Sequence, residues 1–320
     1  MSTALSALLI FIGVGIGVWL FSFVMEALRP VPREPQRLRW APDLPVEHVD
    51  VGGNTLRYIK TGRGPNLVLL HTLRTQLDLF EKVIPELSRH FTVYALDYPG
   101  HGYSDIPKYR YDAAFFTQAV EGFLDRLDLR NVTLAGVSIG GSIALIVAAR
   151  RNPRVARVVA INPYDYAKGR GMARSSLFGG IVTYASLLPV IGETVMRLRN
   201  FLIMRAVLNG GVADPGNIPP ALLKEMYLVG NRPGHYRAFL SLLRNAETWE
   251  TASATKDYGR IEVPVLLVWG DRDWARPPER EHDRSLIPAV QMTTLERGGH
   301  FLPLDRPAEL SQLITRFAGA

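Results

Sequence analysis

Short apolar segments alternate with longer, helix-like segments along the chain from Val46 onward. Several of the short segments are apolar throughout, which is the pattern of strands buried on both faces. Eight strands are expected at residues 46–51, 55–60, 66–70, 91–96, 132–135, 156–161, 263–268 and 291–295. Helices are expected at residues 77–89, 113–127, 140–149 and 307–317. The alternation predicts an α/β protein with a mainly parallel eight-stranded sheet and helices on both faces.

The interval from residue 164 to 258 interrupts this alternation. It contains helical stretches and many Gly and Pro breaks, but no convincing strand. The pattern predicts a core formed by residues 46–163 and 259–320, with residues 164–258 inserted as a helical lid over the carboxyl edge of the sheet. Within the lid, residues 175–192 carry no charge, but Gly and Pro interrupt them and they are short for a membrane span. The interpretations are ordinary lid core, a helix that lines an apolar pocket, and a helix that dips into the membrane interface.

The first 28 residues are expected to form a membrane anchor. Residues 4–24 are an apolar run broken only by Ser and Gly, and the first charged residue is Glu26. About 20 residues suffice for a helix to cross the hydrocarbon core of a bilayer. A cleaved signal peptide is the rival interpretation, but it would have a basic start and a small-residue cleavage site, and neither is evident.

Residues 29–45 form a linker rich in Pro and Arg. Arg29, Arg33, Arg37 and Arg39 follow the apolar run, whereas no Lys or Arg precedes it. The positive-inside rule therefore predicts a single-pass protein with its C-terminal domain on the cytoplasmic side.

The formal net charge of +7 favours contact with anionic surfaces, but the basic residues are scattered. We expect a membrane as the macromolecular partner, and no nucleic acid, because no nucleic-acid-binding motif is present. The chain has no cysteine, which excludes disulfides and thiolate metal sites. No ligand cluster for a metal is evident either.

A Gly-x-Ser-x-Gly pattern at residues 136–140 follows an expected strand and precedes an expected helix. A serine at such a sharp turn is exposed at the top of the sheet, and flanking glycines relieve the backbone crowding. Ser138 is therefore the candidate nucleophile. A serine hydroxyl needs a base to take its proton, and His300, on the loop before the last helix, is the candidate base.

A carboxylate is needed to orient the histidine and to stabilise its charged form. Asp273 follows the expected strand 263–268 and gives the chain order Ser, Asp, His. Asp271 in the same loop and Asp165 after the sixth strand are alternatives. Chain order and loop position favour Asp273.

Residues 46–318 resemble the α/β-hydrolase superfamily, in its lid-bearing branch. Four motifs in order carry the resemblance: Asp97-Tyr98-Pro99-Gly100-His101-Gly102-Tyr103-Ser104, the Ser138 turn, the Gly270–Asp273 loop and Gly299-His300. The resemblance implies a Ser-Asp-His triad that needs no cofactor. It disfavours the dehalogenases and epoxide hydrolases of the superfamily, which use Asp where this chain has Ser138.

The chain departs from the family at its first oxyanion loop. The family usually has His-Gly there, whereas this chain has His71-Thr72-Leu73-Arg74. By position, the resemblance implies the amides of Leu73 and Ile139 as oxyanion donors. Arg74 is a candidate for binding a substrate carboxylate or phosphate, with a structural role as the alternative.

Three functions fit the sequence. The first is a membrane-anchored hydrolase that cleaves an ester, lipid or thioester bond of a lipophilic acyl substrate. The second is a carbon–carbon bond hydrolase or a cofactor-free haloperoxidase, because the same triad supports both. The third is a non-catalytic membrane scaffold or ligand-binding protein that retains the fold.

Overall fold

The computed structural model describes residues 3–253 and 257–319. Its centre is one eight-stranded sheet with the strand order β1-β2-β4-β3-β5-β6-β7-β8. The pairs β1–β2 and β2–β4 are antiparallel and the others are parallel. The strands are β1 (Val46–Val51), β2 (Asn54–Thr61), β3 (Asn66–Leu70), β4 (Thr92–Leu96), β5 (Val132–Val137), β6 (Val155–Ile161), β7 (Val265–Gly270) and β8 (Val290–Leu295). The predicted fold class is confirmed.

A proline explains two of the differences between the predicted segments and the structure. The single helix expected over residues 77–89 is wrong: a 3₁₀ turn, η1 (Leu77–Phe80), is followed by the short helix α2 (Ile84–Leu87). Pro85 has no N–H and its ring clashes with the carbonyl of residue 81, so a continuous helix cannot form. β7 begins two residues later than expected, directly after Pro264, which lacks an N–H for the ladder.

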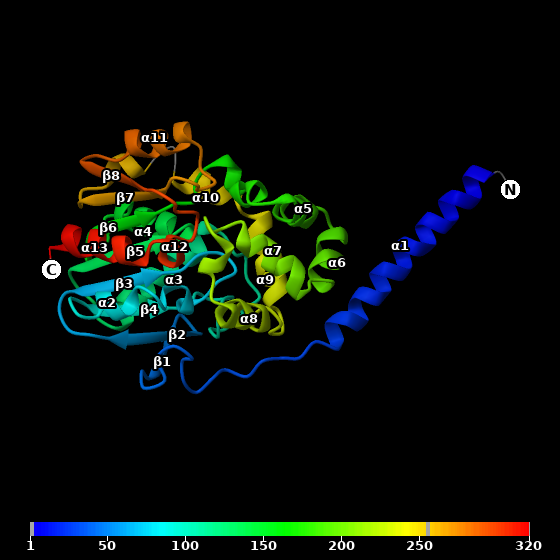
Figure 1. The fold of residues 1–320 in the computed structure, drawn as a ribbon, viewed down its shortest axis with the longest axis horizontal. Coiled ribbons are helices and arrows are strands. Elements are labelled where there is room, and N and C mark those ends of the chain that lie inside the picture. The colour runs from blue at the N-terminus through cyan, green and yellow to red at the C-terminus, as the bar shows by residue number, and fades with distance from the viewer. Residues whose placement is uncertain (1–2, 254–256, 320) are drawn as a thin grey trace.

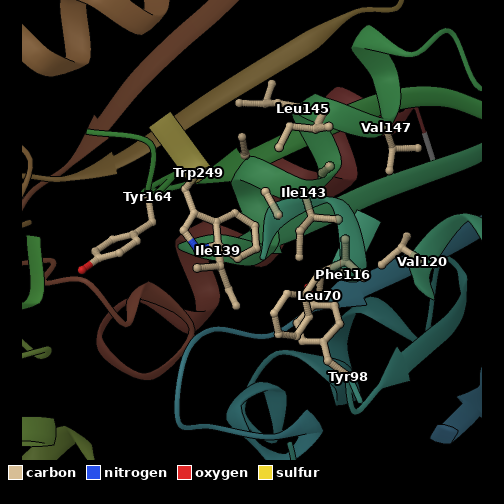
Figure 2. Close-up of a cluster of buried hydrophobic side chains, with 14 of the residues drawn as sticks. Leu70, Tyr98, Phe116, Val120, Ile139, Ile143, Leu145, Val147, Tyr164 and Trp249 are labelled. Atoms are coloured by element: carbon tan, nitrogen blue, oxygen red, sulfur yellow. The ribbon is translucent and has the colours of Figure 1, made fainter. Parts of the chain in front are cut away.

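The helices of the core cover both faces of the sheet (Figure 1). One face packs against α3 (Ala113–Arg126) and α4 (Ile139–Ala149), and the other against α2, α12 (Leu302–Asp305) and α13 (Pro307–Ala318). α11 (Pro277–Leu286) lies between β7 and β8 in the chain. Leu70 of β3, Phe116 of α3 and Ile143 of α4 meet in the first of these cores (Figure 2). All residues of α4 are buried, which fixes the helix that follows Ser138.

The described residues between β6 and β7 form helices and no strand. They are α5 (Leu177–Ser186), α6 (Ile191–Arg197), α7 (Phe201–Asn209), α8 (Pro220–Val229), α9 (His235–Arg244) and α10 (Glu247–Ser253). Short 3₁₀ turns lie among them, at Ala167–Gly169, Gly171–Arg174, Pro215–Asn217 and Tyr258–Arg260. We call residues 164–258 the lid.

The N-terminal helix α1 (Thr3–Ala27) projects away from the rest of the protein (Figure 1). It is long and apolar enough to cross a membrane. The linker that follows it is packed on the core near its end, because Leu38 is buried and Trp40 Nε1 donates to Asp78 Oδ1 at 2.7 Å. Arg39 also forms an ion pair with Glu81. The linker therefore ties α1 to the domain along a defined path.

Candidate active site

Ser138 lies on a strained turn between β5 and α4. Its φ of 59° is in the left-handed region, which is unfavourable for a residue with a side chain. The turn is held by a hydrogen bond from the Ser138 amide to the Ile161 carbonyl at 2.8 Å. A Cβ on Gly136 would lie 2.1 Å from the Gly140 backbone, and a Cβ on Gly140 would lie 2.2 Å from the Leu70 carbonyl oxygen. Only glycine fits at these two positions, and this is why the Gly-x-Ser-x-Gly pattern appears in the sequence.

His300 is held by a carboxylate and by an aromatic ring. Its Nδ1 lies 2.5 Å from Asp273 Oδ2. Asp273 Oδ1 accepts a hydrogen bond from the Ala275 amide at 2.8 Å, so both carboxylate oxygens are engaged. The Trp274 ring stacks on the imidazole with centroids 3.8 Å apart and planes at 15°. The remaining ring nitrogen, Nε2, is the atom available for proton transfer.

Strand order and register bring Ser138, Asp273 and His300 to one edge of the sheet. β5, β6, β7 and β8 are adjacent and parallel, so their carboxyl ends lie together. Ser138 follows β5 directly, and the other two residues lie on the loops after β7 and β8. Ser138 Oγ and His300 Nε2 are both buried and have no hydrogen-bond partner among the described residues. Hydrogen bonds between a nucleophile and its base are often long without substrate and tighten when substrate binds.

Asn162 ties the loops of the site together, and its position after β6 is the one sequence feature that bears on this role. Its Nδ2 donates to the carbonyl oxygens of Gly299 and His300, both at 3.0 Å. Its Oδ1 accepts from the Gly270 amide at 2.8 Å. One buried amide therefore fixes the His300 loop relative to the end of β7.

The two alternative carboxylates lie in other surroundings. Asp271 accepts a hydrogen bond from the Gly298 amide at 2.9 Å. Asp165 is buried, its Oδ2 accepts from the Tyr258 hydroxyl at 2.5 Å, and the Asp283 carboxyl lies beside it. Burial, and then the Asp165 charge, raise the pKa of Asp283 well above its usual range. Among the three candidates, Asp273 is the one whose carboxylate contacts His300.

The Asp165–Asp283 pair predicts a pH-dependent stability. Because the pKa of Asp283 is higher in the folded chain than in the unfolded chain, the folded chain binds more protons, and the free energy of unfolding falls as the pH rises above the usual aspartate range. Asp283→Asn removes this ionisation, while its amide can still donate to Asp165. We expect the variant to melt with the wild type near about pH 4 and about 2–4 °C higher near about pH 8. Melting curves at several pH values check this, with the exposed Asp43→Asn as control. An equal shift at every pH would contradict the assignment.

The two residues expected to donate to the oxyanion, Leu73 and Ile139, follow β3 and β5 in the chain. Ile139 is the first residue of α4, where the amides have no partner within the helix. Leu73 follows β3 and lines a cavity under the lid. Thr72 does not have a positive φ, so its side chain adds no backbone strain, whereas Arg74 does, with φ of 61°. His71 holds the loop, because its Nε2 accepts from the Tyr98 amide at 3.3 Å and its Nδ1 lies 2.8 Å from the Thr72 carbonyl oxygen.

A cavity lies between these loops and the lid helices, and its lining is mostly apolar. The lining residues are Thr72, Leu73, Arg74, Met172, Val182, Met196, Arg199, Ile203, Met204, Val207, Leu208, Phe239, Trp274 and Phe301. Trp274 and Phe301 flank Asp273 and His300 in sequence, so the cavity ends beside the triad. Ser138 and His300 are themselves almost fully buried.

Arg74 is the cationic side chain of the cavity that lacks a carboxylate partner. Its Nη1 lies 3.1 Å from His235 Nδ1, and its guanidinium lies over the Phe239 ring. No Asp or Glu among the described residues forms an ion pair with it, whereas Arg199 is paired with Glu26. Burial, and then the charges of Arg199 and Arg29, lower the pKa of Arg74 to about 9. A buried guanidinium that has no carboxylate partner favours the binding of an anionic group of a ligand.

A model of the alpha/beta hydrolase fold family matches residues 65–307. The match covers most of the chain, so the protein belongs to the α/β-hydrolase family. This agrees with the predicted family, and it supports an enzyme of the hydrolase class.

The chain is similar to hydrolases that act on different bonds. It is 27% identical to the 2-hydroxy-6-oxo-2,4-heptadienoate hydrolase of Pseudomonas putida, over 85% of this chain and 91% of that protein. It is 23% identical to carboxylesterase YbfK of Bacillus subtilis, over 79% of this chain and 80% of that protein. The crystal structure of Cfl2 from Burkholderia cenocepacia has a TM-score of 0.75 at 22% identity, over 90% of this chain and 99% of that one. The fold and the hydrolase class are therefore shared, whereas the substrates of the relatives differ.

Proposed function

We propose that the protein is a membrane-anchored serine hydrolase that cleaves a carboxylic ester bond of a lipophilic acyl substrate. The observation that carries the proposal is Ser138 on its strained turn, at the same sheet edge as a His300 whose Nδ1 lies 2.5 Å from Asp273. A non-catalytic protein would have no need of this combination of strain and paired groups. The carboxylesterase relative supports cleavage of an ester.

The catalytic cycle follows from these positions. Ser138 Oγ attacks the acyl carbonyl carbon and passes its proton to His300 Nε2, while Asp273 holds the Nδ1 proton. The amides of Leu73 and Ile139 bind the oxyanion. The imidazolium protonates the leaving oxygen, which departs as the alcohol. Water, deprotonated by His300, then releases the acid and restores the serine.

The apolar cavity, Arg74 and α1 suggest the kind of substrate. An acyl chain fits a lining of Met, Leu, Ile and Val side chains, and Arg74 offers a site for a carboxylate or phosphate on the same molecule. The apolar helix α1 supports attachment to a membrane, where such substrates concentrate. The Arg residues after α1 favour a cytoplasmic catalytic domain.

Replacing Arg74 tests the anionic part of this proposal. Arg74→Leu should raise KM about 10–100-fold for an acyl ester with a terminal carboxylate, because a charge-assisted hydrogen bond is lost, and should leave a methyl-terminated ester within a few-fold. Steady-state kinetics on the two matched esters check this. Arg237→Leu, which removes an exposed arginine of α9, is the control. An equal loss for both esters would mean that Arg74 only supports the loop.

A carbon–carbon bond hydrolase is the second candidate. The heptadienoate hydrolase relative is aligned over 91% of its length, and its substrate is by name a carboxylate, which Arg74 could bind. Purified full-length protein in detergent should be assayed with short- and long-chain acyl esters and with 2-hydroxy-6-oxo-2,4-heptadienoate. Turnover of the esters alone supports the first proposal, and turnover of the dienoate alone supports the second. If neither is cleaved and a fluorophosphonate probe does not label the protein, the enzymatic proposals are wrong.

A further inference from the structure

Exposed large apolar side chains are concentrated on one part of the lid. From residue 46 onward, the described residues include ten exposed large apolar side chains, and eight of them lie between residues 177 and 202. The eight are Leu177, Phe178, Ile181, Tyr184, Leu188, Val190, Ile191 and Leu202, and we call them the lid face. Leu177 is 77% exposed and Leu202 is 72% exposed. A concentration of this kind marks an interaction surface.

The lid face carries little negative charge. Residues 175–192 have no charged side chain, and Glu193 is the sole acidic residue between positions 171 and 209. Glu193 is paired with Arg244, whose Nη1 lies 2.7 Å from it. Arg205 lies one turn beyond Leu202 on α7 and is exposed, so its long side chain can reach lipid phosphates while its stem stays among apolar groups.

The end of α1 is fixed to the same part of the lid by polar contacts. Arg197 Nε donates to Ser22 Oγ at 2.9 Å, and its guanidinium lies 3.9 Å from the Phe23 ring centroid. Arg199 Nη1 lies 2.6 Å from Glu26 Oε2. Arg29 donates to the carbonyl oxygens of Arg197 and Arg199. α1 contacts α6, which contacts α5, and α5 contacts α7. The helices of the lid face therefore have a fixed position relative to α1.

The length of α1 sets the depth of this junction. A helix rises about 1.5 Å per residue, so about 20 residues of α1 cross a hydrocarbon core of about 30 Å. The remaining residues, from Ser22 to Ala27, then lie at the boundary between hydrocarbon and headgroups. Because Ser22 contacts Arg197 of α6, that helix lies beside the end of α1 (Figure 1). We infer that the lid face, which includes residues of α5 and α6, lies near the same level.

We propose that the lid face is embedded in the bilayer leaflet on the side of the catalytic domain, where the C-terminal end of α1 emerges. The lid is then an element of the membrane interface. This inference rests on the membrane anchor of the proposed function. The same helices line the cavity from within, through Val182, Met196 and Ile203. One layer of helices thus separates lipid from the cavity beside the triad, and a lipophilic substrate enters from the bilayer when these helices move apart.

Single cysteines test the embedding directly, because the chain has none of its own. Leu177→Cys and Leu202→Cys carry an environment-sensitive fluorophore in the full chain, reconstituted in vesicles of phosphatidylcholine and phosphatidylglycerol. Met292→Cys is the matched control, since Met292 is also exposed and belongs to β8, which lies well away from α1 (Figure 1). Ile181→Cys replaces either lid position if that variant does not fold.

Lipids with a spin label near the headgroup should reduce the fluorescence at the lid positions about twofold and leave the control unchanged. Flotation with the vesicles is measured on the same samples. If the protein floats and the lid labels are quenched no more than the control, the lid face is not in the membrane and the inference is wrong, while the anchor stands. If cross-linking the protein into dimers suppresses the quenching at the lid positions, the lid face is covered by a second copy of the chain. That result would also overturn the inference. A protein that does not float removes both the anchor and this inference. None of these outcomes depends on the ester chemistry.

Discussion

Ser138→Ala is expected to lower kcat by about 10⁵–10⁶-fold and to abolish labelling by a fluorophosphonate probe, because the attacking oxygen is lost. The effect should be on kcat, since the alanine leaves the cavity and Arg74 unchanged. The remaining rate over water would come from substrate binding and the oxyanion donors. Turnover of an acyl ester and labelling of the purified protein are the measurements.

Two controls make this result specific to the nucleophile. Ser138 and its alanine replacement both have a Cβ at positive φ, so the melting temperature should change little. Ser285→Ala, on the exposed side of α11, should label and turn over as the wild type does. If the Ser138→Ala protein is folded and still labels, the nucleophile is another residue and the proposed mechanism is wrong.

Asp273→Asn is expected to lower kcat by about 10⁴-fold. The carboxylate accepts a hydrogen bond from the Nδ1–H of His300, and this tautomer leaves Nε2 free to take the serine proton. An asparagine amide can donate to Nδ1 instead, and this favours the tautomer with the proton on Nε2, which cannot act as a base. The charge that stabilises the imidazolium is lost as well. Probe labelling should slow in parallel with turnover.

Asp165→Asn is the matched control for the carboxylate. Its side chain contacts Tyr258 and lies beside Asp283, so we expect activity within a few-fold of the wild type. A large loss in Asp165→Asn with little loss in Asp273→Asn would exchange the two assignments. Comparable losses in both would indicate that each replacement damages the fold, which melting curves would show.

Much of the fold is predictable because buried strands need apolar residues and turns need particular ones. The bounds of β1 and β3 agree with prediction. Pro45 and Gly52 flank β1, and Pro65 directly precedes β3. The segment 77–89 does not, because helical periodicity hides the effect of Pro85. The Ser138 turn is predictable because Gly136 and Gly140 have no room for a side chain.

The site is less predictable, because its contacts join residues that are distant in sequence. Chain order favours Asp273 over Asp165, but the contact with His300 depends on how two loops fold. Asn162 looks like any residue after a strand, and nothing near it in sequence indicates its bonds to Gly299 and Gly270. The contacts of Ser22 and Glu26 with the lid are equally hidden, since composition alone assigns both residues to the anchor.

In the proposed cycle, the stacking of Trp274 on His300 would stabilise the positive charge that forms on the imidazole. An indole face attracts a cation, and this attraction is strongest when water is excluded. When His300 takes the serine proton in that cycle, the charged imidazole would contact the indole at one face and Asp273 at Nδ1, and both groups favour the charge. The imidazole ring also cannot flip, because Trp274 covers one of its faces and Asp273 engages its Nδ1. In the proposed cycle, protons would therefore be exchanged at Nε2 alone, with the oxygen atoms that enter and leave the acyl group.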